Sequence, residues 1–168
     1  SRFQGTNYRR LFHEALPEAL NRLRADPTPV NQAVASATYN MIVEGVVAET
    51  GYHAYLTTLE AHDLLPGMQK IVRLLKRDES RHIAYGVFLL SRLVAEHGEP
   101  VWEAIDDTMA SLLPCVLGII QDIFAGYETM PYDLQVGDFV SYAMKQHRNR
   151  YRRIRRARKM TVEEVLAQ

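Results

Sequence analysis

The sequence predicts an all-α protein of about five helices in a single bundle. Apolar residues recur at helical spacing through most of the 168 residues, and no segment shows the convincing alternation of a half-buried strand. Pro and Gly residues fall between these periodic stretches, where helices are expected to stop. With 47% hydrophobic residues, a chain of this length can bury the core of one domain.

The first two expected helices are separated by the helix-breaking run at residues 26–29, Asp-Pro-Thr-Pro. Thr6 is a candidate cap for the first, whose apolar positions continue to Leu23. The second runs from Val30 to about His62, contains no Pro and is rich in Ala and Val. Its polar residues interrupt at irregular intervals, which predicts a helix buried on more than one face.

A third helix is expected from about Gly67 to Glu96, between Leu65-Pro66-Gly67 and the run His-Gly-Glu-Pro at residues 97–100. Its periodicity predicts the following inward-facing residues: Met68, Ile71, Val72, Leu74, Leu75, Ile83, Val87, Leu90 and Val94.

A fourth helix is expected from about Val101 to Gly126, and Pro114 within it should kink it or divide it in two. A fifth, basic helix is expected at about 134–158. Thr161, with a Glu three residues later, predicts a capped terminal turn.

The formal net charge is zero, but nine of the fifteen residues from Lys145 to Lys159 are Lys or Arg. Most such helical runs are solvated faces, and no DNA-binding motif accompanies this one, so we expect no nucleic-acid partner. Cys115 is the single cysteine, which excludes an internal disulfide. No signal peptide or continuous apolar span is apparent, so we expect a cytoplasmic protein without a transmembrane segment.

Glu79 and His82 form a Glu-x-x-His pair, and Glu44 lies in the preceding helical segment. On a helix, residues three apart project to nearly the same side, so this pair is able to share one metal ion. In di-metal helix bundles a Glu from one helix and a Glu-x-x-His pair from another recur twice. This chain contains the set once, which predicts half of such a site. A surface ion pair is the alternative for Glu79 and His82 alone.

Glu44 strengthens the metal interpretation, because its neighbours from Met41 to Ala48 are almost all apolar. A carboxylate in such a stretch is rarely buried unless it is paired or bound to a metal. Oxygen and imidazole ligands in an open site suit iron or manganese, although zinc is compatible with the same ligand types.

A family resemblance is carried by three runs: YNMIVEG at 39–45, ETGY at 49–52 and DESRH at 78–82. In identity and spacing they closely resemble the ligand-binding oxidases related to the ribonucleotide reductase small subunit. The resemblance implies a ferritin-like helical bundle that assembles a heterodinuclear manganese and iron cofactor, with a di-iron pair as the alternative. It also implies a bound long-chain fatty acid, activation of molecular oxygen, and an ether cross-link between a tyrosine and the Cβ of a valine.

The same resemblance implies roles for individual residues. Glu44, Glu79 and His82 match the ligands of the second, iron-occupied position, and Tyr39 matches the cross-linking tyrosine. Tyr39 precedes Glu44 by five residues, about 140° around an ideal helix, so periodicity alone would not place both on one face. Tyr52 matches a second tyrosine that donates a hydrogen bond to a ligand carboxylate.

A ligand cavity beside Glu44 has some support from Gly45, Ala48 and Gly51, whose small side chains recur every three residues. Close helix packing explains this spacing equally well. If a cavity exists, each buried methylene of an apolar ligand would contribute about 0.8 kcal/mol.

The resemblance covers only the C-terminal half to two-thirds of that family. The helices that supply the first metal position are absent, and so is the valine partner of Tyr39. We therefore expect residues 1–168 to be the C-terminal portion of a single ferritin-like di-metal oxidase domain, a reading favoured by the initial Ser. The alternative is a pair of identical chains that complete a symmetric site across a twofold axis.

These sequence features are compatible with three functions. The first is a di-metal oxidase, expected as a homodimer. The second is a ribonucleotide reductase small subunit, which generates a radical for a partner; the third is a non-catalytic helical interaction module in which Glu44, Glu79 and His82 are structural. The spacing of Tyr39 and Glu44 favours the first.

Overall fold

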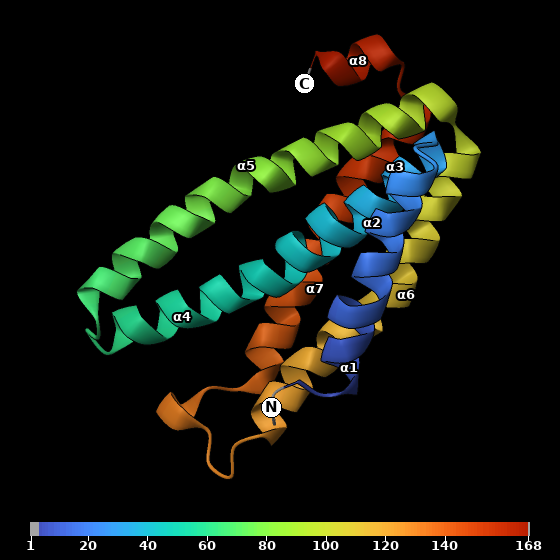
Figure 1. Cartoon of the computed structure of the whole chain (residues 1–168). Helices are drawn as coiled ribbons and strands as arrows, with labels where there is room; N and C mark the ends of the chain where they lie inside the picture. Colours follow the sequence, from blue (N-terminus) through green and yellow to red (C-terminus); the bar gives the residue numbers. More distant parts are fainter. Residues whose placement is uncertain (1–3, 168) are drawn as a thin grey trace.

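A computed structural model describes residues 4–167 of the chain (Figure 1). Over these residues the protein forms six helical segments and no strand, which confirms the all-α prediction. The segments pack along one another as an elongated bundle, with a short last helix across one end (Figure 1).

Two of the segments are continuous helices that change their hydrogen-bonding pattern in the middle. The first contains α1 (Thr6–Arg9), the π-helical η1 (Arg10–Ala15) and α2 (Leu16–Ala25). The second contains α3 (Pro29–Ser36), the π-helical η2 (Ala37–Ala48) and α4 (Glu49–Ala61). Both segments agree with the expected ranges, but the sequence did not indicate either π-helical stretch.

The remaining elements follow in the expected order: α5 (Pro66–His97), α6 (Glu99–Ala125), η3 (Pro131–Asp133), α7 (Val136–Arg156), η4 (Ala157–Lys159) and α8 (Val162–Leu166). Pro114 lies inside α6 without dividing it, so that part of the prediction was wrong. The basic helix agrees closely with its expected range.

Local signals explain several helix ends. Thr28 caps the second segment through its Oγ1, which accepts a hydrogen bond from the Asn31 amide at 3.3 Å. Gly98, with a φ of 71°, separates α5 from α6 in a left-handed conformation that favours glycine. Thr161 and Glu164 form the predicted capping box. Thr6 is the first helical residue rather than the cap, and Gly5 precedes it.

The second helical segment lies at the centre of the bundle, where η2 packs against α5, α6 and α7. It contributes to two apolar cores. Met41 joins Leu90, Ile105 and Ile154 in the first, whereas Ile42 belongs to the second, toward the opposite end of the bundle. Burial on several sides, predicted for this helix from its composition, is thus confirmed.

The helix α5 packs tightly against the central helix at Gly86. A Cβ atom built there would lie 2.4 Å from Asn40 Cβ and 2.9 Å from Met41 Cε, both far closer than normal packing allows. The crossing of α5 over η2 therefore depends on the missing side chain of Gly86.

The apolar face of α5 is only partly covered. Val72, Ile83, Val87, Leu90 and Val94 are buried as predicted. Four further residues predicted to face inward are exposed instead: Met68, Ile71, Leu74 and Leu75. The prediction was wrong for these four because the described residues place no element over the first half of that helix face.

One helix of the described residues, α6, is long and apolar enough to cross a membrane by length and composition alone. Its buried residues include Trp102, Ile105 and Met109 in the first core and Val116 in the second. Such a distribution is what a core helix shows.

Replacing Gly86 with Ala should destabilise the fold by about 1–3 kcal/mol, because the new methyl group collides with Asn40 and Met41. Urea unfolding of the intact polypeptide measures this change. Gly51→Ala is the matched control, since a Cβ at this helical position meets nothing within 4 Å. It should be neutral or stabilise by about 0.5–1 kcal/mol. Equal effects of the two substitutions would contradict the packing argument.

Candidate metal centre

Glu44, Glu79 and His82 converge where η2 faces α5. One ligand atom from each lies within 4.8 Å of the other two. His82 Nδ1 is 3.3 Å from Glu44 Oε1 and 3.4 Å from Glu79 Oε2. The structure therefore brings together the three residues that the sequence singled out, from two different helices, in an arrangement able to hold a metal ion.

Burial of the carboxylates supports the fit to a cation. Glu44 is 4% exposed, although a charged carboxylate is costly to bury without a partner. Glu79 Oε2 is buried and accepts no hydrogen bond, although His82 Nδ1 lies 3.4 Å away. A buried carboxylate oxygen without a donor is the kind of atom that a metal ion satisfies. His82 is exposed, so the group opens to the surface on its side.

A polar relay along η2 fixes the orientation of Glu44. Ser36 Oγ donates to Asn40 Oδ1 at 2.9 Å, and Asn40 Nδ2 donates to Glu44 Oε2 at 2.9 Å. This leaves Glu44 Oε1 directed at His82. Ser36 and Asn40 were not predicted as site residues, although the spacing of four residues from Ser36 to Asn40 and from Asn40 to Glu44 in an apolar stretch indicates a shared helix face.

The π-helical geometry of η2 explains the position of Tyr39. In a π-helix the hydrogen bonds join residues five apart, which brings such residues to the same side. A hydrogen bond with Glu44 raises the pKa of the Tyr39 phenol, and desolvation and the charges of Glu44 and Glu79 raise it further. The expectation of a separation of about 140° was wrong because it assumed an α-helix. Tyr39 remains 43% exposed.

Tyr52 lies on the other side of the carboxylate group, in α4. Burial raises the pKa of its phenol, and the charge of Glu79 and a hydrogen bond with it add to this effect. Tyr39 and Tyr52 therefore flank the candidate ligands from the same long helix, one before Glu44 and one after it.

Charge also affects His82. Desolvation lowers the pKa of its imidazole, but the charge of Glu44, a hydrogen bond with it and the charge of Glu79 together raise the pKa above its ordinary value. The carboxylates therefore create a negative electrostatic potential around His82. A negative potential of this kind favours binding of a cation.

A second buried carboxylate, Glu49, lies one helical turn beyond Glu44 and was not singled out from the sequence. It accepts a hydrogen bond from the Tyr142 hydroxyl at 3.1 Å, and Lys76 Nζ lies 3.7 Å away. His53 stacks on the Tyr142 ring with centroids 4.0 Å apart. Glu49 therefore has a local cation and donor and is not free to bind a metal. This network connects α4, α5 and α7.

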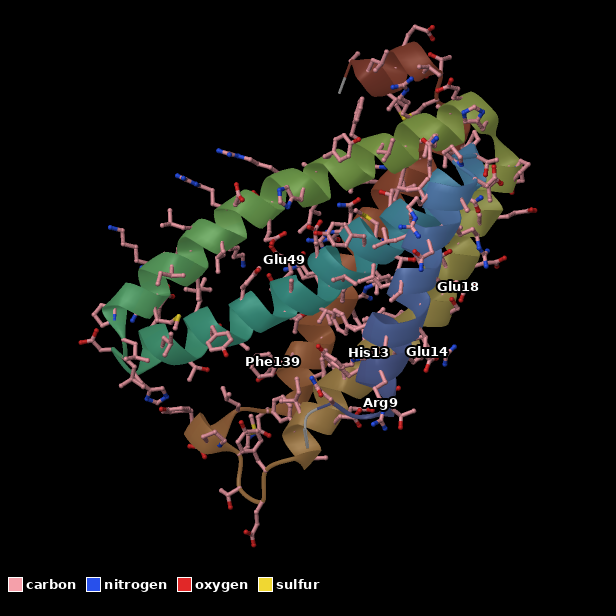
Figure 2. The ribbon with its side chains drawn as sticks, viewed as in Figure 1. Arg9, His13, Glu14, Glu18, Glu49 and Phe139 are labelled. Atoms are coloured by element: carbon pink, nitrogen blue, oxygen red, sulfur yellow. The ribbon has the colours of Figure 1, made fainter. Side chains whose placement is uncertain are left out.

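Other titratable residues lie apart from the candidate ligands. Figure 2 shows His13, Glu14 and Glu18 on the first helical segment, whereas Glu49 lies on the central one. Asp78, four residues before His82, pairs weakly with Arg81 at 3.6 Å on the exposed side of α5. Its charge still contributes to raising the pKa of His82.

No protein-family model matches the chain. Solved structures do. An R2-like ligand-binding oxidase from Sulfolobus acidocaldarius is 35% identical, with a TM-score of 0.84 over 96% of this chain and 53% of its own. A variant of R2-like ligand-binding oxidase with an aerobically reconstituted Mn/Fe cofactor is 33% identical, with a TM-score of 0.81 over 89% of this chain and 57% of its own.

A second variant, with an anaerobically reconstituted Mn/Fe cofactor, is 35% identical, with a TM-score of 0.80 over 89% of this chain and 53% of its own. These are strong matches in both fold and sequence. The chain spans little more than half the length of the structures that it matches.

We expect His82→Ala to weaken binding of manganese or iron at least about tenfold, and Asn40→Ala, which frees Glu44 to rotate, to weaken it by about tenfold. Metal content after equilibrium dialysis measures both. His97→Ala is the control, because His97 pairs only with Glu96 at the distant end of α5. Unchanged metal content in the His82 variant would contradict the assignment.

Proposed function

We propose, from the premise that this chain belongs to the R2-like ligand-binding oxidase family, that it forms one half of an oxygen-activating Mn/Fe carboxylate oxidase. The convergence of Glu44, Glu79 and His82 within 4.8 Å carries the proposal. Structures that share this fold at 33–35% identity are named oxidases with a Mn/Fe cofactor, which supports it.

Each residue has a distinct task in this proposal. Glu44, Glu79 and His82 would hold one metal ion, and Glu79, whose buried Oε2 accepts no hydrogen bond, would also be available to a second. Asn40 keeps Glu44 in its binding orientation. The bound metals would supply the redox equivalents for reaction with oxygen, and iron and manganese suit such oxygen and imidazole ligands. A di-iron pair is the alternative.

Tyr39 is the proposed partner in an ether cross-link with a valine beyond these 168 residues. The phenol loses its proton and the valine Cβ loses a hydrogen atom as the new C–O bond forms. In total, two protons and two electrons leave the tyrosine and the valine; oxygen would accept them, and the bound metals would supply the redox chemistry for this. The contact of Tyr39 with Glu44 supports this role, because it keeps the phenol next to the metal ligands.

A long-chain fatty acid is the proposed ligand. Between α4, α6 and α7 lies an apolar cavity of about 220 Å³, lined in part by Gly51, Ala54, Ile120 and Phe139. Burial of each methylene there contributes about 0.8 kcal/mol, which favours an alkyl chain over a small polar substrate. Gly51 follows Glu44 by seven residues on the same continuous helix, and we propose that a chain in the cavity directs its carboxyl end toward the metal ligands.

The exposed face of α5 is the proposed docking surface for the other half of the site. Ile71, Leu75 and Tyr85 are exposed on the same helix face as His82, at spacings of three, four and seven residues. We propose that two further helices carry the second carboxylate set onto this face. They belong to the same polypeptide in our preferred interpretation and to an identical chain in the alternative.

The assembled protein is proposed to be a homodimer in a reducing compartment. The free thiol of Cys115 supports the assignment to a reducing compartment. Cys115 is the only cysteine of the sequence, and it is buried without a disulfide.

The intact mass of the native polypeptide, measured with its metal content after anaerobic purification, tests the proposal. A mass near twice that of residues 1–168, with both manganese and iron, is expected. A mass near 19.2 kDa with two chains per metal pair would favour the symmetric site. Absence of iron and manganese from a folded, full-length preparation would overturn the oxidase and leave a structural interaction module. Radical formation in complex with a larger partner would instead indicate a reductase subunit.

Oxygen treatment of the fully metallated protein should join the Tyr39 peptide to a valine-containing peptide with the loss of two hydrogen atoms. Peptide mass spectrometry detects the product. Tyr39→Phe removes the phenol oxygen and should abolish it, whereas Tyr55→Phe, at an exposed position of the same helix, should leave it intact. An unmodified Tyr39 peptide after oxygen treatment would contradict the cross-link.

Gly51→Leu should reduce the amount of fatty acid that copurifies with the protein several-fold, because the side chain fills the cavity that Gly51 lines. Mass spectrometry of the organic extract measures this. Gly67→Leu is the matched control, since Gly67 lies outside the cavity and its Cβ would meet nothing within 4 Å. Equal fatty acid content in both variants would place the ligand elsewhere.

A further inference from the structure

A basic hollow lies where α7 ends, far along the chain from the candidate metal ligands. Its volume is about 560 Å³. Five of its six lining residues are cationic, and the full set is Glu99, Arg152, Arg155, Arg156, Arg158 and Lys159.

The one acidic residue of the basic hollow is already neutralised. Arg158 Nη2 donates to both oxygens of Glu99, at 2.8 and 2.9 Å, and its guanidinium lies 5.2 Å from the Trp102 ring centroid. These contacts hold the Arg158 side chain in place at one side of the basic hollow. Among the described residues, the other four cations of the hollow form no ion pair with an acidic side chain. An uncompensated positive potential therefore fills it.

Two structural explanations account for only part of this arrangement. Cations near the end of α7 stabilise the helix dipole, but the effect falls off within the last turn and does not require a shared hollow. The second explanation is that another part of the fold packs over the hollow and covers its charges. All six lining residues of the hollow are charged, whereas the face of α5 around His82 exposes large apolar side chains. The basic hollow therefore lacks the apolar surface on which a further helix would pack.

We propose that the basic hollow binds an anion that carries two or more phosphate groups. Guanidinium groups pair with phosphate through two parallel hydrogen bonds, and four unpaired cations match the charge of such a ligand. A free polyphosphate and a phosphorylated lipid headgroup share this chemistry. The inference stands independently of the oxidase function, because it uses none of the candidate metal ligands.

Calorimetric titration of the intact polypeptide with tripolyphosphate at low ionic strength tests the site. We expect one bound anion, with an affinity that falls as salt is added. The double substitution Arg152→Gln with Arg156→Gln should weaken binding by about tenfold or more. The single substitution Arg155→Gln should weaken it less. All the changed residues are exposed, so the variants should remain folded, with a midpoint of thermal unfolding lowered only slightly by the loss of cations from the last turn of α7.

The matched control is the double substitution Arg148→Gln with Arg153→Gln. It removes the same charge from exposed positions of the same helix but outside the basic hollow, so binding should change less than about twofold. Equal loss in both double variants, or no binding of tripolyphosphate by the unchanged protein, would overturn the proposal.

Flotation with phosphatidylcholine vesicles, with and without a phosphoinositide, separates the two sources. Phosphoinositide-dependent flotation that the Arg152 and Arg156 substitutions abolish assigns the hollow to a lipid headgroup. Tripolyphosphate binding without flotation assigns it to a free anion. Binding of duplex DNA that tripolyphosphate does not displace would contradict a discrete phosphate site.

Discussion

Burial of the Glu44 carboxylate is the constraint on which the rest of the structure depends. The side chain projects from the central helix of the bundle, with 4% of the residue exposed, so it cannot reach bulk water. An unpaired buried charge costs several kcal/mol, and Asn40 satisfies only one of its oxygens. The other faces His82 on α5. The close crossing of the two helices at Gly86 is therefore what gives the carboxylate its partner, and it also brings Glu79 into range.

The π-helical stretch η2 then determines which residues share the side of Glu44. Hydrogen bonds between residues five apart widen the helix, so Tyr39 and Asn40 both face the carboxylate from one turn earlier. In a regular α-helix only Asn40 would do so. Twelve residues of π-helix exceed the single-turn bulges in which this geometry mostly occurs. Its position at the candidate site agrees with the tendency of π-helical segments to lie at functional sites.

Features that depend on short-range chemistry were predictable from the sequence. The turn at Gly98 and the capping box at Thr161 follow from neighbouring residues alone, and the pairing of Glu79 with His82 follows from helical spacing. The Glu49 and Tyr142 contact was not predictable, because it depends on how α4 and α7 cross. Periodicity detects an apolar face but does not reveal what covers it, as the exposed half of α5 demonstrates.

In the proposed assembly, the exposed face of α5 couples formation of the two-metal site to helix docking. His82 lies between apolar residues that include Ile71, Leu75 and Tyr85, all of them open to solvent in the described residues. Covering a large apolar side chain contributes about 1.5–3 kcal/mol, so covering several of them would stabilise a docked helix. The same contact removes water from His82 and strengthens its attraction to a bound cation. In the proposed assembly, the helices that supply a second set of carboxylates also bury this surface, so metal binding and docking would stabilise each other.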